Sequence, residues 1–178
     1  MNKAIFIDKD GTLIHDVPYN VNPDLVRLER YALESLFELQ QHGFHLIIIS
    51  NQPGVALKYF KEDALKMVEE KIKKLLFENR VSLEGFYYCP HSDRSGCACR
   101  KPKPGLLLKA AHDLQIDLSQ SWMVGDILND VEAGNRSGAR TILIDNGNET
   151  EWLLNKQRQP DYKVKDLKEA AEVILLHE

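Results

Sequence analysis

The fold class follows from the stretch Ala4-Ile5-Phe6-Ile7-Asp8-Lys9-Asp10-Gly11-Thr12. Its four apolar residues predict a buried strand, and the polar residues after them predict a loop that carries two aspartates. Other apolar runs of strand length are found at 44–49, 86–88, 122–124 and 141–144, and they alternate with helical patterns at 31–41, 61–79, 104–114, 129–137 and 167–176. This alternation predicts an α/β fold, a Rossmann-like three-layer sandwich in which helices cover a mostly parallel sheet.

Length and composition favour a single domain over residues 1–178. No proline-rich, glycine-rich or single-sign charged segment marks a linker or a tail. Only about 40 residues separate Asp10 from Ser50, which is too few for a large cap domain between the first two strand ends. We therefore expect loops to control access to any site at these ends.

The charge and the apolar runs exclude several classes of partner. A net charge of −4 gives no basic face for nucleic acid. The longest apolar runs are far too short to cross a bilayer, and the first residues lack the long apolar region of a signal peptide. We expect a cytoplasmic, monomeric protein that binds a small molecule and has neither a nucleic-acid nor a membrane partner.

All three cysteines lie within one short segment, residues 89–99. Together with a histidine they form the pattern C-x-H-x5-C-x-C, whose possible ligands are Cys89, His91, Cys97 and Cys99. Four such ligands can fill a tetrahedral Zn²⁺ site, so the pattern predicts a structural zinc-binding loop. The zinc would fix the chain just before Arg100 and Lys101. Three free thiols beside a surface histidine are the alternative.

Polar side chains follow several of the predicted strands. Asp8 and Asp10 follow the first strand, Ser50 and Asn51 close the second, and Asp126 ends a later one. Because the carboxyl ends of parallel strands meet at one edge of a sheet, these side chains are expected to lie together. Two carboxylates there could bind Mg²⁺, while one attacks a phosphoryl group and the other handles the proton of the leaving group.

The remaining polar residues could supply the positive charge and the phosphate-binding groups that such a reaction needs. A carboxylate that attacks a phosphate dianion must overcome repulsion between two negative groups, so the site needs a metal and a fixed cation. Arg100 and Lys101 are the candidate cations, and the polar residues that close the second strand are candidates for holding phosphate oxygens. Asp130 could order the shell around the metal. Taken singly, each residue has a structural alternative, such as an acidic turn, a solvated lysine or a helix cap.

In this order and at successive strand ends, the residues resemble the motifs of the haloacid dehalogenase superfamily. The resemblance implies that Asp8 is the nucleophile, that Asp10 is the general acid and base, and that Ser50 binds phosphate. It further implies that Lys101 is the fixed cation and that Asp126 is a metal carboxylate. Asp10 would bind Mg²⁺ through its main-chain carbonyl, beside the carboxylates of Asp8 and Asp126. The implied activity is a phosphatase reaction through an aspartyl phosphate.

Further segments narrow the resemblance. Residues 85–91, 97–105 and 121–126, and the run Asn51-Gln52-Pro53-Gly54-Val55-Ala56, are similar to D-glycero-D-manno-heptose 1,7-bisphosphate phosphatases. The resemblance extends from about Ile5 to Asp145. It implies removal of the C7 phosphate of a phosphorylated sugar, in the pathway to activated heptose for cell-surface polysaccharide. Substrate contacts are then implied for Gln52, Arg100 and the lip from Asp16 to Tyr19.

Three departures leave other functions open. Pro53 replaces the usual serine, Ile127 stands where some members have lysine, and the zinc loop is short, as it also is in the related histidinol-phosphate phosphatases. A histidinol-phosphate phosphatase is therefore one alternative. A non-catalytic phosphosugar-binding protein is another, although the presence of Asp8 and Asp10 disfavours it.

Overall fold

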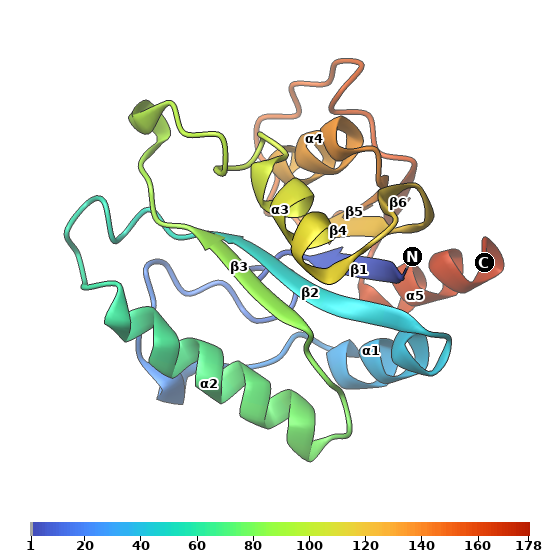
Figure 1. The fold of residues 1–178 in the computed structure, drawn as a ribbon, viewed down its shortest axis with the longest axis horizontal. Helices are drawn as coiled ribbons and strands as arrows, with labels where there is room; N and C mark the ends of the chain where they lie inside the picture. The colour runs from blue at the N-terminus through green and yellow to red at the C-terminus, as the bar shows by residue number, and fades with distance from the viewer. Residues whose placement is uncertain (1) are drawn as a thin grey trace.

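The computed structural model describes residues 2–178 and contains a sheet of parallel strands covered by helices (Figure 1). The strands of this sheet are β1 (Lys3–Ile7), β2 (Phe44–Asn51), β3 (Gly85–Cys89), β4 (Trp122–Gly125), β5 (Arg140–Ile144) and β6 (Tyr162–Val164). They lie in the order β3-β2-β1-β4-β5-β6, and every neighbouring pair is parallel. The predicted α/β fold is confirmed.

Helices follow the predicted segments closely. They are α1 (Ala32–Gln41), α2 (Asp63–Glu78), α3 (Gly105–Leu114), α4 (Leu128–Ser137) and α5 (Leu167–Leu176), with single 3₁₀ turns η1 (Pro23–Leu25), η2 (Asp93–Ser95) and η3 (Leu118–Gln120). Within residues 2–178, none of the helices has the length and apolar character needed to cross a membrane.

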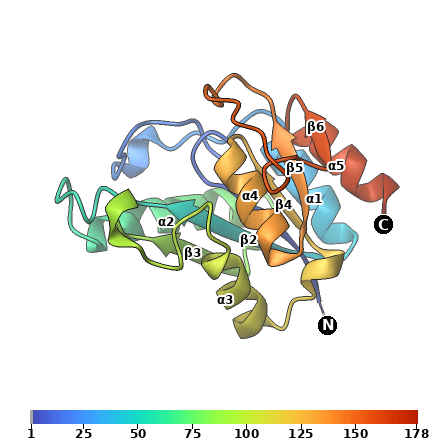
Figure 2. The ribbon, with the colours of Figure 1, turned by 90° about the horizontal axis from the view of Figure 1, so that it is seen from above.

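The helices cover both faces of the sheet, which gives the predicted three layers (Figure 2). On one face, Ile5 and Ile7 of β1 lie in a cluster with apolar residues of α1, α2 and α5. On the other face, Ala4 and Phe6 lie in a cluster with residues of α3 and with Ala133 of α4. Alternate residues of β1 are thus buried on opposite sides, which explains why its sequence is a continuous apolar run.

Strand β1 occupies the position where the strand order reverses. It pairs with β2 on one side and with β4 on the other. In open parallel sheets, ligands bind at such a point, outside the carboxyl ends of the strands. The fold therefore gathers Asp8 after β1, Ser50 at the end of β2 and Asp126 after β4 at one edge.

The short strand β6 was not predicted from the sequence. Its three residues pair with Ile142–Ile144 of β5. The N–H of Asp145 also donates to the carbonyl of Val164 at 2.8 Å, an ordinary distance for such a hydrogen bond. Three residues are too few for a hydrophobic period to be recognised. The long connection before β6 returns past the carboxyl edge of the sheet, where its side chains meet the site described next.

Candidate active site

Lys101 crosses the end of β2 and reaches the carboxylate that follows β1. Its ammonium donates to Asp8 Oδ1 at 2.5 Å, to Asp130 Oδ1 at 2.6 Å and to the carbonyl oxygen of Ile49 at 2.9 Å. All three charged side chains are buried. Lys101 is thus fully satisfied and held beside Asp8, and its role as a fixed cation stays a prediction.

Burial and unbalanced charge set the protonation of this group. Burial raises the pKa of Asp8 to about 7, the charges of Asp130 and Asp10 add to the rise, and Lys101 opposes it. For Lys101, burial would lower the pKa, but the carboxylates of Asp130 and Asp8 outweigh burial and the net shift is upward. Lys101 therefore stays protonated at neutral pH, whereas Asp8 lacks enough positive charge around it.

Asp126 is held through both of its oxygens. Thr12 donates its hydroxyl to Oδ1 at 2.8 Å, and Asn148 donates its amide to Oδ2 at 2.7 Å. Burial and then the charge of Asp8 raise the pKa of Asp126 to about 6, against the opposing hydrogen bonds. Asp130 is engaged differently, because it accepts from Lys101 and from the N–H of Ile127 at 3.3 Å.

The carboxylates fit a divalent cation. Oxygens of Asp8, Asp126 and Asp130 all lie within 4.8 Å of one another. Among residues 2–178, the cation paired with this group is Lys101, so three buried negative charges face one positive charge. A Mg²⁺ ion would neutralise the remaining two charges, and oxygen donors are the ligands that it prefers.

Asp10 lies between two donors. Lys9 Nζ is 3.1 Å from its Oδ1, and Gln52 Nε2 donates to its Oδ2 at 3.1 Å. The same Gln52 nitrogen donates to Ser50 Oγ at 2.8 Å. Gln52 therefore connects the proposed general acid to the proposed phosphate ligand, while the buried Lys9 was not recognised from the sequence.

Asn51 braces the backbone of Lys101. Its Oδ1 accepts from the N–H of Lys101 at 3.0 Å, and its Nδ2 donates to the carbonyl of Lys101 at 3.1 Å. Both ends of the amide are thus used to hold the lysine. The expected contact between Asn51 and a phosphate oxygen stays a prediction.

The predicted lip lies beside Asp10. Burial and the charge of Asp10 raise the pKa of Asp16, and Lys9 opposes the rise. Tyr19 is about half exposed and packs edge to face against Tyr59, with ring centroids 4.7 Å apart. The structure therefore brings Asp16 near Asp10 and Lys9 and leaves Tyr19 about half exposed.

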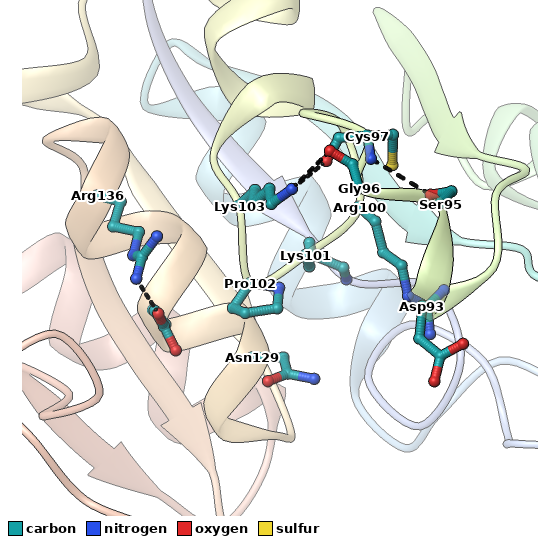
Figure 3. A pocket seen from close by; sticks show the side chains of 11 residues that line it. Asp93, Ser95, Gly96, Cys97, Arg100, Lys101, Pro102, Lys103, Asn129 and Arg136 are labelled. Atoms are coloured by element: carbon teal, nitrogen blue, oxygen red, sulfur yellow. Dashed lines mark hydrogen bonds and ion pairs between the residues drawn. The ribbon is translucent and has the colours of Figure 1, made fainter.

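A pocket of about 410 Å³ opens between the cysteine-rich loop and α4 (Figure 3). Lys101 lines it together with the side chains of Arg100, Lys103, Asn129 and Arg136. Two carboxylates, Asp93 and Glu132, line the same opening, and Arg136 is paired with Glu132 at 2.6 Å. The cations outnumber the carboxylates, so the surface is suited to an anionic substrate.

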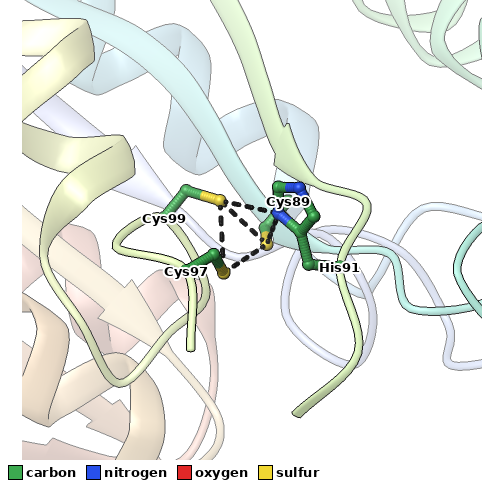
Figure 4. A group of neighbouring side chains, drawn as sticks. All are labelled: Cys89, His91, Cys97 and Cys99. Carbon is green, nitrogen blue, oxygen red and sulfur yellow. Dashed lines mark hydrogen bonds between the residues drawn. The ribbon is translucent and has the colours of Figure 1, made fainter. Parts of the chain in front are cut away.

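The four predicted zinc ligands converge on one point (Figure 4). The sulfur–sulfur distances are 3.0 to 3.6 Å, and His91 Nδ1 lies 3.4 Å from Cys89 Sγ and 3.2 Å from Cys99 Sγ. A tetrahedron with Zn–S bonds of about 2.3 Å has edges of about 3.8 Å. The four donors therefore fit Zn²⁺ after a small expansion.

Contacts join this cluster to the active-site lysine. Lys103 donates to the carbonyls of Gly96 at 2.9 Å and Cys97 at 2.6 Å, and Arg100 donates to the carbonyl of His91 at 3.3 Å. Lys101 lies between these two residues in the sequence, so the chain on both sides of it is bonded to the cysteine-rich loop.

Thr12, Lys9 and Asn148 are the site residues that sequence reasoning missed. Thr12 stands within the first motif, so its position was a usable signal. Lys9 could have been noticed as a lysine between two aspartates. Asn148 had no signal, because it belongs to a connection whose path depends on the unpredicted strand β6.

Comparison with known proteins identifies relatives of this chain. A family model described as HAD-hydrolase-like matches residues 98–170. The D-glycero-beta-D-manno-heptose-1,7-bisphosphate 7-phosphatase of Haemophilus influenzae is 43% identical over 140 residues, which are 75% of this chain and 76% of the relative. The enzyme of the same description from Escherichia coli K12 is 36% identical over 168 residues, or 85% and 88% of the two chains.

Solved structures give the same result. The D,D-heptose 1,7-bisphosphate phosphatase from B. bronchiseptica, complexed with magnesium and phosphate, superposes with a TM-score of 0.83 at 27% identity and covers 99% of both chains. The parallel sheet and the aspartate–lysine site thus define a HAD-like hydrolase. Within that class, the chain belongs to the heptose-1,7-bisphosphate 7-phosphatase family and is a phosphatase.

Proposed function

We propose that this phosphatase removes the C7 phosphate of D-glycero-D-manno-heptose 1,7-bisphosphate with the help of Mg²⁺. The main support is the buried group in which Asp8 contacts Lys101 at 2.5 Å and shares a cluster of oxygens with Asp126. The descriptions of the similar enzymes support the substrate. The cationic pocket beside Lys101 offers room for the second phosphate.

Asp8, Asp126 and the main-chain carbonyl of Asp10 would hold the magnesium ion. Bound there, Mg²⁺ would offset the negative charge of the phosphate and polarise its P–O bonds. Ser50 would bind a phosphate oxygen. Lys101 contributes a fixed positive charge, so that the approach of phosphate to Asp8 is less strongly opposed.

The first half of the reaction transfers the phosphoryl group to the protein. A carboxylate oxygen of Asp8 attacks phosphorus, and the bond between phosphorus and the C7 oxygen breaks. Asp10 gives its proton to that oxygen, so the sugar leaves as an alcohol. Lys9 and Gln52 hold the two oxygens of Asp10 and thereby favour one orientation of the acid.

The second half regenerates the enzyme. Asp10, now a carboxylate, takes a proton from water while the water oxygen attacks the phosphorus of the aspartyl phosphate. The bond between phosphorus and Asp8 breaks, which releases inorganic phosphate and the free carboxylate. Asp8 is then again a free carboxylate and Asp10 again carries a proton, so the net reaction is hydrolysis of the C7 phosphate ester by one water molecule.

The cysteine cluster has a structural part in this proposal. Cys89, His91, Cys97 and Cys99 would bind one Zn²⁺ ion and leave it no open position for substrate. With zinc bound, the hydrogen bonds from Lys103 and Arg100 to the loop would restrict the motion of the Lys101 backbone between them.

We further propose that residues 1–178 act as one domain and as a cytoplasmic monomer. The three cysteines are free thiols gathered in one place, which suits a reducing compartment. Sedimentation velocity at micromolar concentration measures the monomeric state, and a dimer would contradict it.

A substrate panel tests the main proposal. The values of kcat/KM would be compared for heptose 1,7-bisphosphate, a heptose 7-phosphate, histidinol phosphate and p-nitrophenyl phosphate, each with Mg²⁺. We expect the bisphosphate to give the highest value. A higher value for histidinol phosphate would reject the heptose assignment, and the Asp8→Asn variant, expected to be inactive, would show that any activity belongs to this site.

A further inference from the structure

The connection between β5 and β6 contacts both loops that carry the proposed magnesium ligands. Asn146 donates its amide to the carbonyl of Gly11 at 2.8 Å. Asn148 donates its amide to Asp126 Oδ2 at 2.7 Å. Glu149 accepts the N–H of Leu128, just after Asp126, at 2.7 Å. Three of four consecutive residues thus bond to the two metal loops.

Asn148 is itself held in place. Its N–H donates to Asn146 Oδ1 at 3.1 Å, which fixes the turn before the amide. Gly11 packs so closely that a Cβ atom there would lie 2.6 Å from Asn148 Nδ2 and 2.4 Å from Asp126 Oδ2. The amide, the carboxylate and the glycine backbone therefore fit together without spare space.

Two donors from distant parts of the chain fix the plane of the Asp126 carboxylate. Thr12 holds Oδ1 and Asn148 holds Oδ2. A carboxylate oxygen has more than one lone pair, so each can accept a hydrogen bond and still bind a cation. Without Asn148, the carboxylate would rotate more freely and would have to be ordered when the metal binds.

We infer that Asn148 is a positioning residue for the magnesium site. The inference rests on the proposed function, because it assumes that Asp126 is a metal ligand. Loss of a hydrogen-bond partner behind a metal ligand typically weakens metal affinity about 10- to 100-fold. Asn148→Ala should therefore raise the dissociation constant of the divalent ion by about this factor.

A merely structural asparagine would behave differently. If Asn148 only closed the loop, its removal would lower the melting temperature and would lower kcat by the same factor at every Mg²⁺ concentration. A positioning role instead predicts that kcat recovers to within a few-fold of the wild-type value at saturating Mg²⁺, with the defect confined to metal affinity.

Mn²⁺ binding tests the inference without turnover. Free Mn²⁺ is measured by electron paramagnetic resonance as it is added to zinc-containing, magnesium-free protein. The Asn155→Ala variant is the matched control, since Asn155 lies in the same connection but accepts from the N–H groups of Gln157 and Arg158. Asn148→Leu repeats the test with a side chain of similar size, should Asn148→Ala fold poorly.

The outcomes separate the inference from the proposed function. We expect weaker Mn²⁺ binding for both Asn148 variants and wild-type binding for Asn155→Ala. Wild-type affinity in a folded Asn148 variant would overturn the inference while leaving the proposed metal site intact. Absence of Mn²⁺ binding to the wild-type protein, or full binding to Asp126→Asn, would reject the metal site itself.

Discussion

Acidification of the magnesium-free protein should stabilise the part of the fold that contains Asp126. The pKa of this buried carboxyl rises from 3.8 to about 6, first through burial and then through the charge of Asp8. The folded protein therefore binds this proton more tightly than the unfolded chain. It follows that stability rises as pH falls through about 6, and that the gain is complete below the unfolded pKa.

The shift of about two units corresponds to about 3 kcal/mol over the whole window, at about 1.4 kcal/mol per unit. Only part of this appears between pH 7 and pH 5, because the unfolded carboxyl is still ionised at pH 5. The expected gain over this narrower range is about 1 kcal/mol. Asp8, whose pKa is also raised, does not add a full second contribution, since protonation of either group relieves the repulsion between them.

Urea unfolding at pH 7, 6 and 5 would measure this effect in the wild-type protein and in Asp126→Asn. The variant has no charge to neutralise at this position, and loss of zinc in acid should affect both proteins alike. The free energy of unfolding of the wild type, minus that of the variant, should therefore rise by about 1 kcal/mol from pH 7 to pH 5. Saturating Mg²⁺ should remove the rise, because the ion binds the ionised carboxylates.

A difference that stays flat, or that falls with acid, would refute the reasoning. Either result would mean that Asp126 is not short of positive charge in the magnesium-free protein. The buried carboxylates would then not carry two uncompensated charges for a divalent ion to neutralise.

Three other substitutions test separate parts of the site. Asp10→Asn should slow phosphoryl transfer from a sugar about 10²- to 10⁴-fold but spare transfer from p-nitrophenyl phosphate, whose leaving group needs no proton. Rapid quench should show a burst of nitrophenolate. Equal slowing for both substrates would contradict the role of Asp10. Cys97→Ser should lower zinc content, melting temperature and activity together, so a zinc-free variant with unchanged melting and activity would argue against a structural zinc. Gly11→Ala should lose at least about 1 kcal/mol of stability, because Gly11 has a φ of 84°. The variant should also bind Mn²⁺ weakly, because a Cβ at this position would lie 2.4 Å from Asp126 Oδ2. Wild-type melting and Mn²⁺ affinity would show that the backbone can relax.

The elements with a clear hydrophobic period were predictable from the sequence. Strand β1 is apolar from Ala4 to Ile7 because helices cover both faces of the sheet. Helix α2 shows the 3.6-residue period of a helix with one covered face. Strand β6 has only three residues, one of them the exposed Lys163, so its place in the sheet depends on β5 and not on its own pattern.

The same distinction applies to the site. Residues at the ends of β1, β2 and β4 could be brought together in advance, because parallel strands finish at one edge. The hydrogen-bond partners within the site could not be predicted in this way. Asn148 reaches Asp126 only because its loop returns across the sheet edge, and Asn51 turns towards the Lys101 backbone because both amide ends find partners there.

The central position of β1 also governs how the protein acquires activity during folding. Lys3 pairs with Phe44 and Ile5 with Trp122, so the strand that carries the nucleophile depends on partners far along the chain. Contacts of such large sequence separation form slowly, because the intervening chain must be ordered first. During synthesis, Asp8 would thus leave the ribosome long before the strands that pair with β1 are made. The active site would be completed only late in folding, when β4 pairs with β1 and brings Asp126 beside Asp8.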